Sequence, residues 1–279
     1  MPKTVYYNGN FYNDGEAVIP LSDRSIFFGD AVYDAMIGRG EKIFLCEDHI
    51  KRLIRNAERL RIPVPHALSS LEDILYNVVK NSQLDEFFLY VQLSRCFDER
   101  IHAYPDSQYS SLLITASEYT LPSRKKRLKL LSTEDERYGF CDVKTVNLLP
   151  AVLASRLATE AACDEAVFHR GEVVTECAHS NISILKNGRL ITHPDGKRIL
   201  PGISKKHLLS ACESLGVPYD ERPFTLGELF DCDEALVTST SKICLAASSL
   251  DGVPIGGKDQ RLLKLLQNYM FEEYAFWTM

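Results

Sequence analysis

Short strands joined by tight turns, and mixed with helices, most restrict how this chain can fold. Four dipeptides typical of tight turns separate apolar segments: Asn8-Gly9, Arg39-Gly40, Asn187-Gly188 and Asp251-Gly252. A hairpin joins antiparallel strands, whereas parallel strands need a long crossover connection. The pattern therefore predicts an α+β fold and not a regular parallel α/β array.

Helical periodicity occurs between the strand-like segments. A helix is predicted over 48–61, with Asp48 as its N-cap and apolar residues on one face. Another begins near Ser204 and ends at Gly216. Further helices are expected over 69–82, 149–162 and 259–274. The expected strands include 87–93, 112–116, 128–131, 165–169, 172–175, 181–185, 189–192 and 234–238.

A polar segment that contains Pro122 interrupts this alternation near the middle of the chain. The chain has 279 residues, which is more than a typical single domain contains. Domain boundaries tend to fall in polar, proline-containing segments. We therefore predict an N-terminal α/β domain over 1–117, a linker over 118–124 and a C-terminal domain over 125–279.

Charge and cysteine usage exclude several classes of function. The net charge of −6 argues against broad nucleic-acid binding. The 8 cysteines form no Cys-x-x-Cys pair and have no histidine at zinc-ligand spacing, so we expect free thiols and no metal site. There is no signal-peptide-like apolar run and no stretch long enough for a membrane span. We expect a cytoplasmic protein without nucleic-acid or membrane partners.

Three segments carry groups suited to binding a small anion. Gly202-Ile203-Ser204 opens a helix, where free N–H groups and the helix dipole favour phosphate. Four hydroxyls follow one another at a strand end, in 238–241, and Arg52 lies on the helix over 48–61. Taken singly, these features are more often a helix start, a solvated turn and a charged helix face.

Lys144 stands in a mostly apolar segment, 141–149, just before a predicted helix. Apolar surroundings destabilise the ammonium form of a lysine, which leaves the amine available as a nucleophile. Schiff-base formation requires such an amine. A surface lysine at a strand end is the alternative that the local sequence leaves open.

Together these segments resemble the fold-type IV pyridoxal 5′-phosphate (PLP) enzymes, the class IV aminotransferase family, over nearly the whole chain. The marks agree in order and spacing: Asp23-Arg24, Phe28-Gly29-Asp30, the segment His49 to Leu53, Lys144, Glu176-x-x-x-x-Asn181, Pro201-Gly202-Ile203 and Thr238-Ser239-Thr240. The resemblance implies PLP as cofactor. It also implies a smaller N-terminal domain and a larger C-terminal domain in which strands form a pseudo-barrel with flanking helices.

The resemblance also implies roles for single residues. Lys144 is the Schiff-base lysine and moves the proton between the substrate Cα and the cofactor C4′. Glu176 lies against the pyridine nitrogen and keeps it protonated, so that the ring can accept electrons. Arg52 binds the phosphate as a bidentate donor. The other cofactor-binding residues implied are Asn181, Leu200, Ile203, Ser204, Ser239 and Thr240.

The segment Arg100-x-His102 distinguishes among members of the family. In an extended segment, residues two apart point to the same side, so the guanidinium and the imidazole would converge on one small anion. Followed by Tyr104-Pro105, it resembles the carboxylate-binding loop of D-amino acid aminotransferases. There the loop reaches in from the neighbouring subunit and works with a tyrosine, here Tyr33, which implies a homodimer. An exposed charged loop is the alternative.

The activity implied is transamination between D-amino acids and 2-oxo acids, with D-alanine and 2-oxoglutarate giving pyruvate and D-glutamate. A branched-chain L-amino acid aminotransferase, an aminodeoxychorismate lyase and a catalytically silent PLP-binding protein are the alternatives. His179, Ala35 and Ile37 depart from the residues usual in D-amino acid aminotransferases and leave the side-chain preference open.

Overall fold

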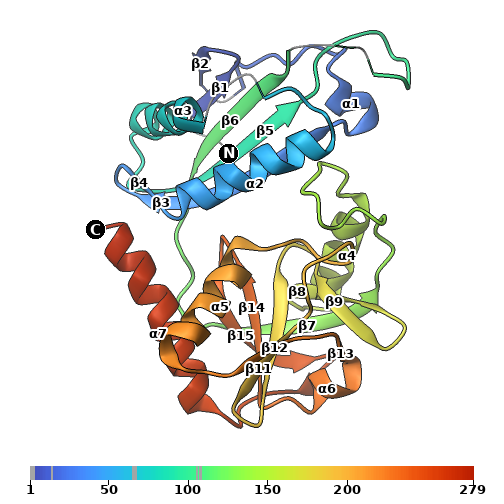
Figure 1. Ribbon diagram of the computed structural model, residues 1–279, viewed down its shortest axis with the longest axis vertical. Helices are drawn as coiled ribbons and strands as arrows, with labels where there is room; N and C mark the ends of the chain where they lie inside the picture. The colour runs from blue at the N-terminus through green and yellow to red at the C-terminus, as the bar shows by residue number, and fades with distance from the viewer. Residues whose placement is uncertain (1–3, 14, 65–67, 105, 107–108) are drawn as a thin grey trace. The chain divides into compact units, whose positions relative to one another are not determined.

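The computed structural model describes residues 4–13, 15–64, 68–104, 106 and 109–279. The chain forms two compact units (Figure 1), and each is described by itself. Unit 1 comprises Met1–Thr120, Val143–Asn147 and Phe276–Met279, and unit 2 comprises Leu121–Asp142 and Leu148–Ala275. The short segment that contains Lys144 therefore belongs to unit 1. The domain limits given by the sequence stay a prediction.

Unit 1 contains a six-stranded sheet in the order β2-β1-β6-β5-β3-β4. The strands are β1 (Thr4–Tyr7), β2 (Asn10–Tyr12), β3 (Ala31–Arg39), β4 (Lys42–Ile43), β5 (Glu86–Ser94) and β6 (Ser111–Glu118). Every neighbouring pair is antiparallel. The helices are α1 (Arg24–Phe28), α2 (Cys46–Arg59) and α3 (Leu68–Ser82).

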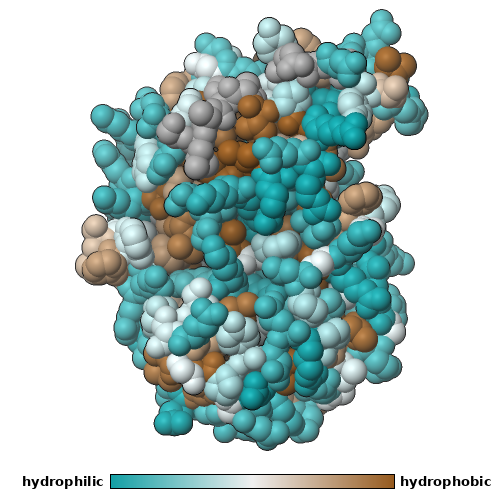
Figure 2. Space-filling model, viewed as in Figure 1, coloured by the Kyte–Doolittle hydropathy of each residue, from teal (hydrophilic) through white to brown (hydrophobic). Residues whose placement is uncertain are grey.

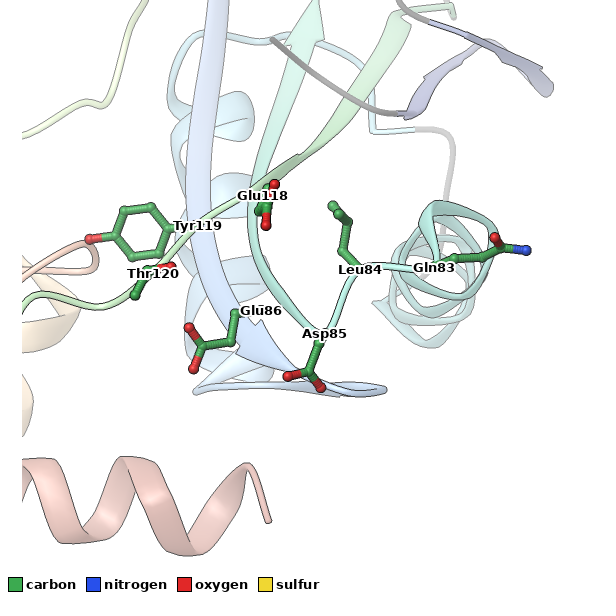
Figure 3. A pocket seen from close by; sticks show the side chains of 7 residues that line it. All are labelled: Gln83, Leu84, Asp85, Glu86, Glu118, Tyr119 and Thr120. Atoms are coloured by element: carbon green, nitrogen blue, oxygen red, sulfur yellow. The ribbon is translucent and has the colours of Figure 1, made fainter.

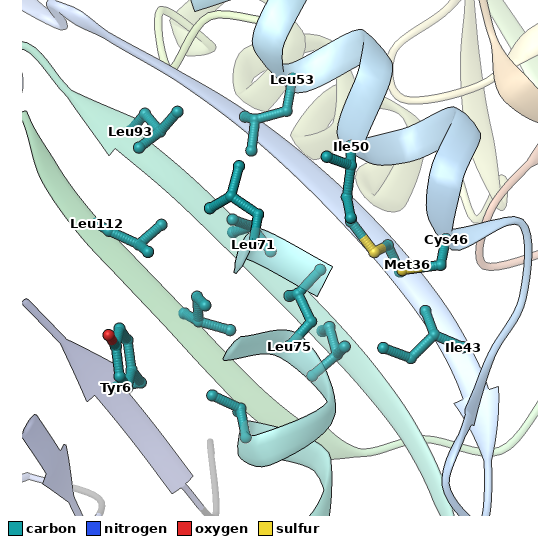
Figure 4. Packing of buried hydrophobic residues seen from close by; sticks show 14 of the residues in the cluster. Tyr6, Met36, Ile43, Cys46, Ile50, Leu53, Leu71, Leu75, Leu93 and Leu112 are labelled. Atoms are coloured by element: carbon teal, nitrogen blue, oxygen red, sulfur yellow. The ribbon is translucent and has the colours of Figure 1, made fainter. Parts of the chain in front are cut away.

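The core of unit 1 lies between the sheet and helices α2 and α3. Figure 4 shows Ile50 and Leu53 of α2 pointing toward the sheet, with Ile50 beside Met36 of β3 and Leu75 of α3 in the same layer. These four side chains are buried. Burying a side chain of this size stabilises the fold by about 1.5–3 kcal/mol, which fixes α2 firmly against β3.

One prediction about the helices of unit 1 is wrong, and one helix was not predicted. The N-cap of α2 is Leu45, and Asp48 lies inside the first turn with Glu47. Negative side chains there interact favourably with the helix dipole, so the acidic pattern marks the helix start without capping it. The sequence also missed the short helix α1, whose N-cap Asp23 accepts from the Ser25 N–H at 2.9 Å.

Unit 2 contains a ten-stranded mixed sheet that curls into a half-barrel (Figure 1), as the predicted fold class requires. Nine strands follow the order β12-β11-β10-β14-β15-β7-β8-β9-β13, and β16 pairs with β15. They are β7 (Arg127–Glu134), β8 (Glu165–Arg170), β9 (Val173–Cys177), β10 (Asn181–Lys186), β11 (Arg189–Thr192), β12 (Tyr219–Glu221), β13 (Phe224–Thr225), β14 (Glu234–Ser239), β15 (Ile243–Leu250) and β16 (Val253–Pro254). The helices are α4 (Leu149–Glu160), α5 (Ile203–Leu215), α6 (Leu226–Phe230) and α7 (Gln260–Trp277).

Local sequence signals in both units give the structures expected of them. All four predicted turns join antiparallel strands. Gly216 ends α5 in the left-handed conformation at φ 66°, which costs a glycine no steric strain. Residues 138–147, between β7 and α4, lie in turns and irregular backbone apart from an isolated bridge at Thr145.

Within the described ranges, no helix is long and apolar enough to cross a membrane. The face in Figure 2 is mainly hydrophilic and includes the outward side of α2. The cytoplasmic location given by the sequence stays a prediction.

Candidate active site

The backbone of residues 144–146 extends the sheet of unit 1 at the start of β3. The Tyr33 N–H donates to the Lys144 carbonyl at 2.9 Å, and the Val146 N–H donates to the Ala31 carbonyl at 3.3 Å. This pairing places the half-buried Lys144 Nζ 4.4 Å from the centroid of the Tyr33 ring, a cation–π contact. Tyr33 in turn stacks on Tyr90. Two predicted site residues therefore lie together.

The next residue on β3, Asp34, points to the opposite face and meets α2. Arg52 donates from Nε and Nη2 to the two Asp34 carboxylate oxygens, each at 2.8 Å, and His49 Nδ1 lies 2.8 Å from Oδ1. His49 and Arg52 are three residues apart and so share one side of the helix. Asp34 is completely buried and Arg52 is 5% exposed. Arg52, the predicted phosphate ligand, is therefore held by a residue that the sequence analysis missed.

The charges of this cluster compensate one another. Burial by itself would raise the pKa of Asp34, but the nearby Arg52 and His49 hold that pKa far below its usual range. Burial lowers the pKa of His49. The positive charges of Arg52 and Lys144 also lower the pKa of His49. Both cations therefore lie near the His49 imidazole.

Buried arginines hold the loop that carries Arg100 and His102. Arg24 donates to the carbonyls of Ile101 and His102 at 2.8 and 3.2 Å, and to Asp30 at 2.9 Å. Asp30 also accepts from Arg95 at 2.8 Å. The extended conformation expected for 100–102 is wrong, because the Ile101 N–H donates back to the Glu99 carbonyl at 2.8 Å and the chain bends.

The bent loop still places both side chains beside one aromatic ring. The Arg100 guanidinium lies 5.7 Å from the Phe28 ring centroid, and the His102 ring lies 5.4 Å from it. Both residues are exposed. They contact Phe28, whereas Tyr33 contacts Lys144 and Tyr90, so the structure does not bring the three predicted carboxylate ligands together within one chain. Pro105, the last residue of this motif, lies outside the described residues.

In unit 2 the buried Glu176, at the end of β9, accepts from three groups. Arg137 Nη1 donates to Oε1, Asn181 Nδ2 donates to Oε2 at 2.9 Å, and the Leu200 N–H lies 3.1 Å from both oxygens. Asn181 Nδ2 also donates to the Leu200 carbonyl at 2.9 Å. Three predicted site residues, Glu176, Asn181 and Leu200, are therefore linked directly, together with Arg137, which the sequence analysis missed.

The start of α5 offers groups that fit a phosphate. No side chain caps the helix, whose N-cap is Gly202, so the first-turn N–H groups of Ile203 and Ser204 suit an anion. A Cβ at Gly202 would lie 1.9 Å from Asn181 Oδ1, so the backbone approaches this side chain more closely than any other residue type permits. The residues present therefore fit a phosphorylated cofactor.

The hydroxyl-rich turn after β14 is the other part of the predicted phosphate site. Ser239 Oγ and Ser241 Oγ lie 3.3 Å apart. Thr238 Oγ1 is buried without a hydrogen-bond partner in the described part of the chain. Such buried orphan hydroxyls are rare and mark places where a ligand or water supplies the missing partner.

His179 belongs to a small charged cluster on unit 2. Its Nε2 lies 3.0 Å from Lys242 Nζ, and its Nδ1 lies 3.3 Å from Glu165 Oε1. Lys242 also pairs with Glu165 at 3.0 Å and donates to Ser180 at 3.4 Å. His179, which differs from the residue usual in D-amino acid aminotransferases, thus lies beside a lysine whose charge compensates the buried Glu165.

Figure 3 shows a hollow elsewhere on unit 1, at the ends of β5 and β6. Its lining includes Asp85, Glu86 and Glu118, which would repel a phosphate or a carboxylate. No predicted site residue lines it.

Comparison with known proteins identifies the family. The model of the family Amino-transferase class IV matches residues 31–250. This chain belongs to the class IV aminotransferases. It is a PLP-dependent enzyme of the aminotransferase type, and the sequence-based predictions of family and cofactor are confirmed.

Curated relatives are similar over nearly their whole length. D-alanine aminotransferase of Staphylococcus haemolyticus is 32% identical over 267 residues, which cover 94% of this chain and 95% of the relative. That of Listeria innocua is 32% identical over 275 residues, with 96% and 95% covered. These relatives support an aminotransferase of the D-amino acid type.

Solved structures show the same fold. The branched-chain amino acid aminotransferase of Escherichia coli has a TM-score of 0.90 at 18% identity, covering 100% of this chain and 97% of the other. The branched-chain aminotransferase of Thermoproteus uzoniensis with norvaline has a TM-score of 0.86 at 20% identity, covering 99% and 98%. A further branched-chain amino acid aminotransferase, solved with pyridoxamine 5′-phosphate, has a TM-score of 0.87 at 21% identity, covering 99% and 98%. The predicted fold-type IV architecture is therefore confirmed.

Proposed function

We propose that this class IV aminotransferase transfers the amino group between D-amino acids and 2-oxo acids, with D-alanine and 2-oxoglutarate giving pyruvate and D-glutamate. The anchored loop that presents Arg100 and His102 beside Phe28 carries this proposal. A guanidinium and an imidazole on one side of a loop suit a carboxylate, which both substrates have. The curated D-alanine aminotransferases support the same choice.

PLP supplies, when bound, a ring that accepts electrons from the substrate Cα. We propose that Lys144, Arg52, Glu176 and Asn181 hold it. Arg52 would bind the phosphate with a guanidinium already oriented by Asp34. The other proposed cofactor contacts are Leu200, the N–H groups of Ile203 and Ser204, Ser239 and Thr240.

Lys144 Nζ would carry the proton in the reaction. Its amine would take the proton from the substrate Cα and return it at the cofactor C4′. A cation–π contact with Tyr33 keeps Nζ near one position while the amine is charged. Tyr33 would also help to bind the substrate carboxylate, together with Arg100 and His102.

A second copy of the chain would supply Arg100 and His102 to each active site in a homodimer. Exposed apolar side chains support such an assembly. On α4 in unit 2, the outward residues Leu149, Val152, Leu153 and Leu157 are 49–67% exposed. A row of exposed apolar residues of this kind marks an interaction surface.

Assays with two substrate pairs test the proposed activity. The purified protein with PLP receives either D-alanine or L-leucine, each with 2-oxoglutarate, and pyruvate or 4-methyl-2-oxopentanoate is measured. We expect pyruvate from D-alanine. Turnover of L-leucine alone would instead identify a branched-chain L-amino acid aminotransferase. Absence of both products from a PLP-bound protein would favour the lyase or the silent protein.

A further inference from the structure

Arg137 links two buried carboxylates in unit 2 and lies in the irregular segment after β7. Its Nε and Nη2 donate to the two oxygens of Asp135 at 2.8 and 3.0 Å, and its Nη1 donates to Glu176. A guanidinium is planar and permanently charged. Pairing one edge with Asp135 therefore fixes the direction in which Nη1 meets Glu176.

Asp135 is itself held on its other side. Its side chain is completely buried and also accepts from Arg170 Nε and Thr175 Oγ1, each at 3.1 Å. The Arg137 guanidinium packs 4.6 Å above the Phe168 ring centroid. These contacts leave the Asp135–Arg137 pair little freedom to turn, because both carboxylate oxygens and one face of the guanidinium are occupied.

The charges in the cluster agree with this geometry. Burial would by itself lower the pKa of Arg137, but hydrogen bonding to Asp135 and the charge of Glu176 raise it above its usual value. The hydrogen bonds and charge of Arg137 hold the pKa of Asp135 below its usual range despite burial. Arg137 therefore stays a cation that faces two carboxylates.

We infer that Arg137, fixed by Asp135, is a positioning residue that keeps Glu176 ionised and correctly oriented toward the ring nitrogen of PLP. The inference rests on the proposed function, which puts Glu176 at that nitrogen. A cation in contact with a carboxylate favours its charged form. A proton held between Glu176 and the ring nitrogen therefore lies on the nitrogen, where it strengthens the electron-accepting ring.

The test uses the complete protein loaded with PLP that carries nitrogen-15 in its ring. Nuclear magnetic resonance of that nitrogen reports its protonation without any substrate. For Arg137→Gln we expect a shift toward the unprotonated position. We also expect kcat for D-alanine to fall about tenfold or more while KM stays within about threefold, because the loss is confined to the transition state. Arg137→Lys keeps the charge and should recover part of both.

Arg222→Gln is the matched control, because it removes an exposed arginine of unit 2 that pairs with Glu228, outside the cluster around Asp135 and Glu176. Its nitrogen signal and kcat should equal those of the wild type. An unchanged nitrogen signal in Arg137→Gln would overturn the inference. Should that variant not fold, Asp135→Asn decides in the same way, since Arg137 loses its anchor.

The two proposals can fail separately. The nitrogen signal needs only bound PLP, so it tests the role of Arg137 even in a protein that does not use D-alanine. If the wild type does not turn over D-alanine, the proposed substrate is wrong. The nitrogen-15 signal then still decides whether Arg137 has the inferred role.

Discussion

Asp34 shows how a single buried carboxylate controls a binding residue. It is completely buried on β3 and pairs with two polar residues of α2 that face it, His49 and Arg52. A buried ion pair contributes little net stability, but removal of one partner leaves the other charge without compensation. The main consequence of the Asp34–Arg52 pair is therefore that it fixes the direction of the Arg52 guanidinium.

The variant Asp34→Asn tests this role. We expect the free energy of unfolding of the PLP-free protein to fall by about 3–5 kcal/mol, because Arg52 loses its buried counter-charge. PLP affinity should fall as well, by titration of cofactor absorbance. The exposed Glu47→Gln, on the same helix, is the control: it should leave PLP affinity unchanged and lower the free energy of unfolding by at most about 1 kcal/mol. Unaltered PLP affinity in Asp34→Asn would show that Arg52 does not depend on Asp34.

Arg100→Ala tests the proposed carboxylate contact. Loss of a charge-assisted hydrogen bond costs about 1.5–3 kcal/mol, so we expect KM for D-alanine to rise more than about tenfold. PLP should stay bound, as its absorbance would show. The control Arg189→Ala removes an exposed arginine that pairs with Asp220 and should leave KM unchanged. If Arg100→Ala loses PLP, Arg100 has a structural role and the proposed carboxylate contact is wrong.

At the scale of elements, the start of α5 and the start of β10 are fitted closely to each other. Gly202 leaves room for the Asn181 side chain, which also binds Glu176 and the Leu200 carbonyl. One helix start therefore influences both the proposed phosphate site and the carboxylate proposed to face the ring. This coupling comes from tertiary packing, since 21 positions separate the two residues in sequence.

Gly202→Ala should disturb both sites at once. The new Cβ would lie 1.9 Å from Asn181 Oδ1, so the side chain or the helix start must move. We expect weaker PLP binding, measured by equilibrium titration, and a lower melting temperature. Gly227→Ala is the control, since its Cβ would lie 3.7 Å from the nearest atom, and alanine in a helix should stabilise by about 0.5–1 kcal/mol. Equal PLP affinities in the two variants would contradict the role of Gly202.

At the scale of the whole molecule, stability should fall as the pH falls. Because the pKa of His49 is lowered in the folded protein, below about pH 6.5 the unfolded chain takes up a proton on His49 more readily than the folded chain does. Proton uptake therefore favours the unfolded state. The lowered pKa of Asp34 adds a second loss below about pH 4. Urea unfolding between pH 8 and 4 should show a free energy that decreases toward acid. A free energy that increases below pH 6.5 would contradict the neutral, buried state of His49.

Assembly is the other property of the whole molecule that can be tested. If α4 forms a subunit interface, Leu153→Glu should give a monomer in light scattering and should lower the transamination rate, because each site would lack the partner's loop. The control Thr159→Glu adds the same charge at an exposed position near the end of α4. A dimer that persists in Leu153→Glu would exclude this surface as the interface.

Local signals in the sequence determined much of the protein. Hairpin dipeptides, the glycine after α5 and helical periodicity act over a few residues, so they predict the α+β class and most elements. The family and PLP were predicted differently, from a resemblance in which motif residues such as Lys144, Glu176, Arg52 and Asn181 agree in order and spacing over nearly the whole chain. Asp48 failed as an N-cap because an acidic residue suits the first turn equally well.

Only the tertiary structure decided how charged residues from distant segments compensate one another. Asp34 is a carboxylate in the middle of a mainly apolar strand, a signal that could have been recognised, but its partners come from α2. Arg137 gave no signal, because it lies in an irregular polar segment. Asp135 is only two residues away in sequence, but Glu176 meets Arg137 only after β7, β8 and β9 assemble. Sequence patterns record which groups are present. Whether a buried charge is stable depends on which groups surround it, because a buried charge without a partner is costly.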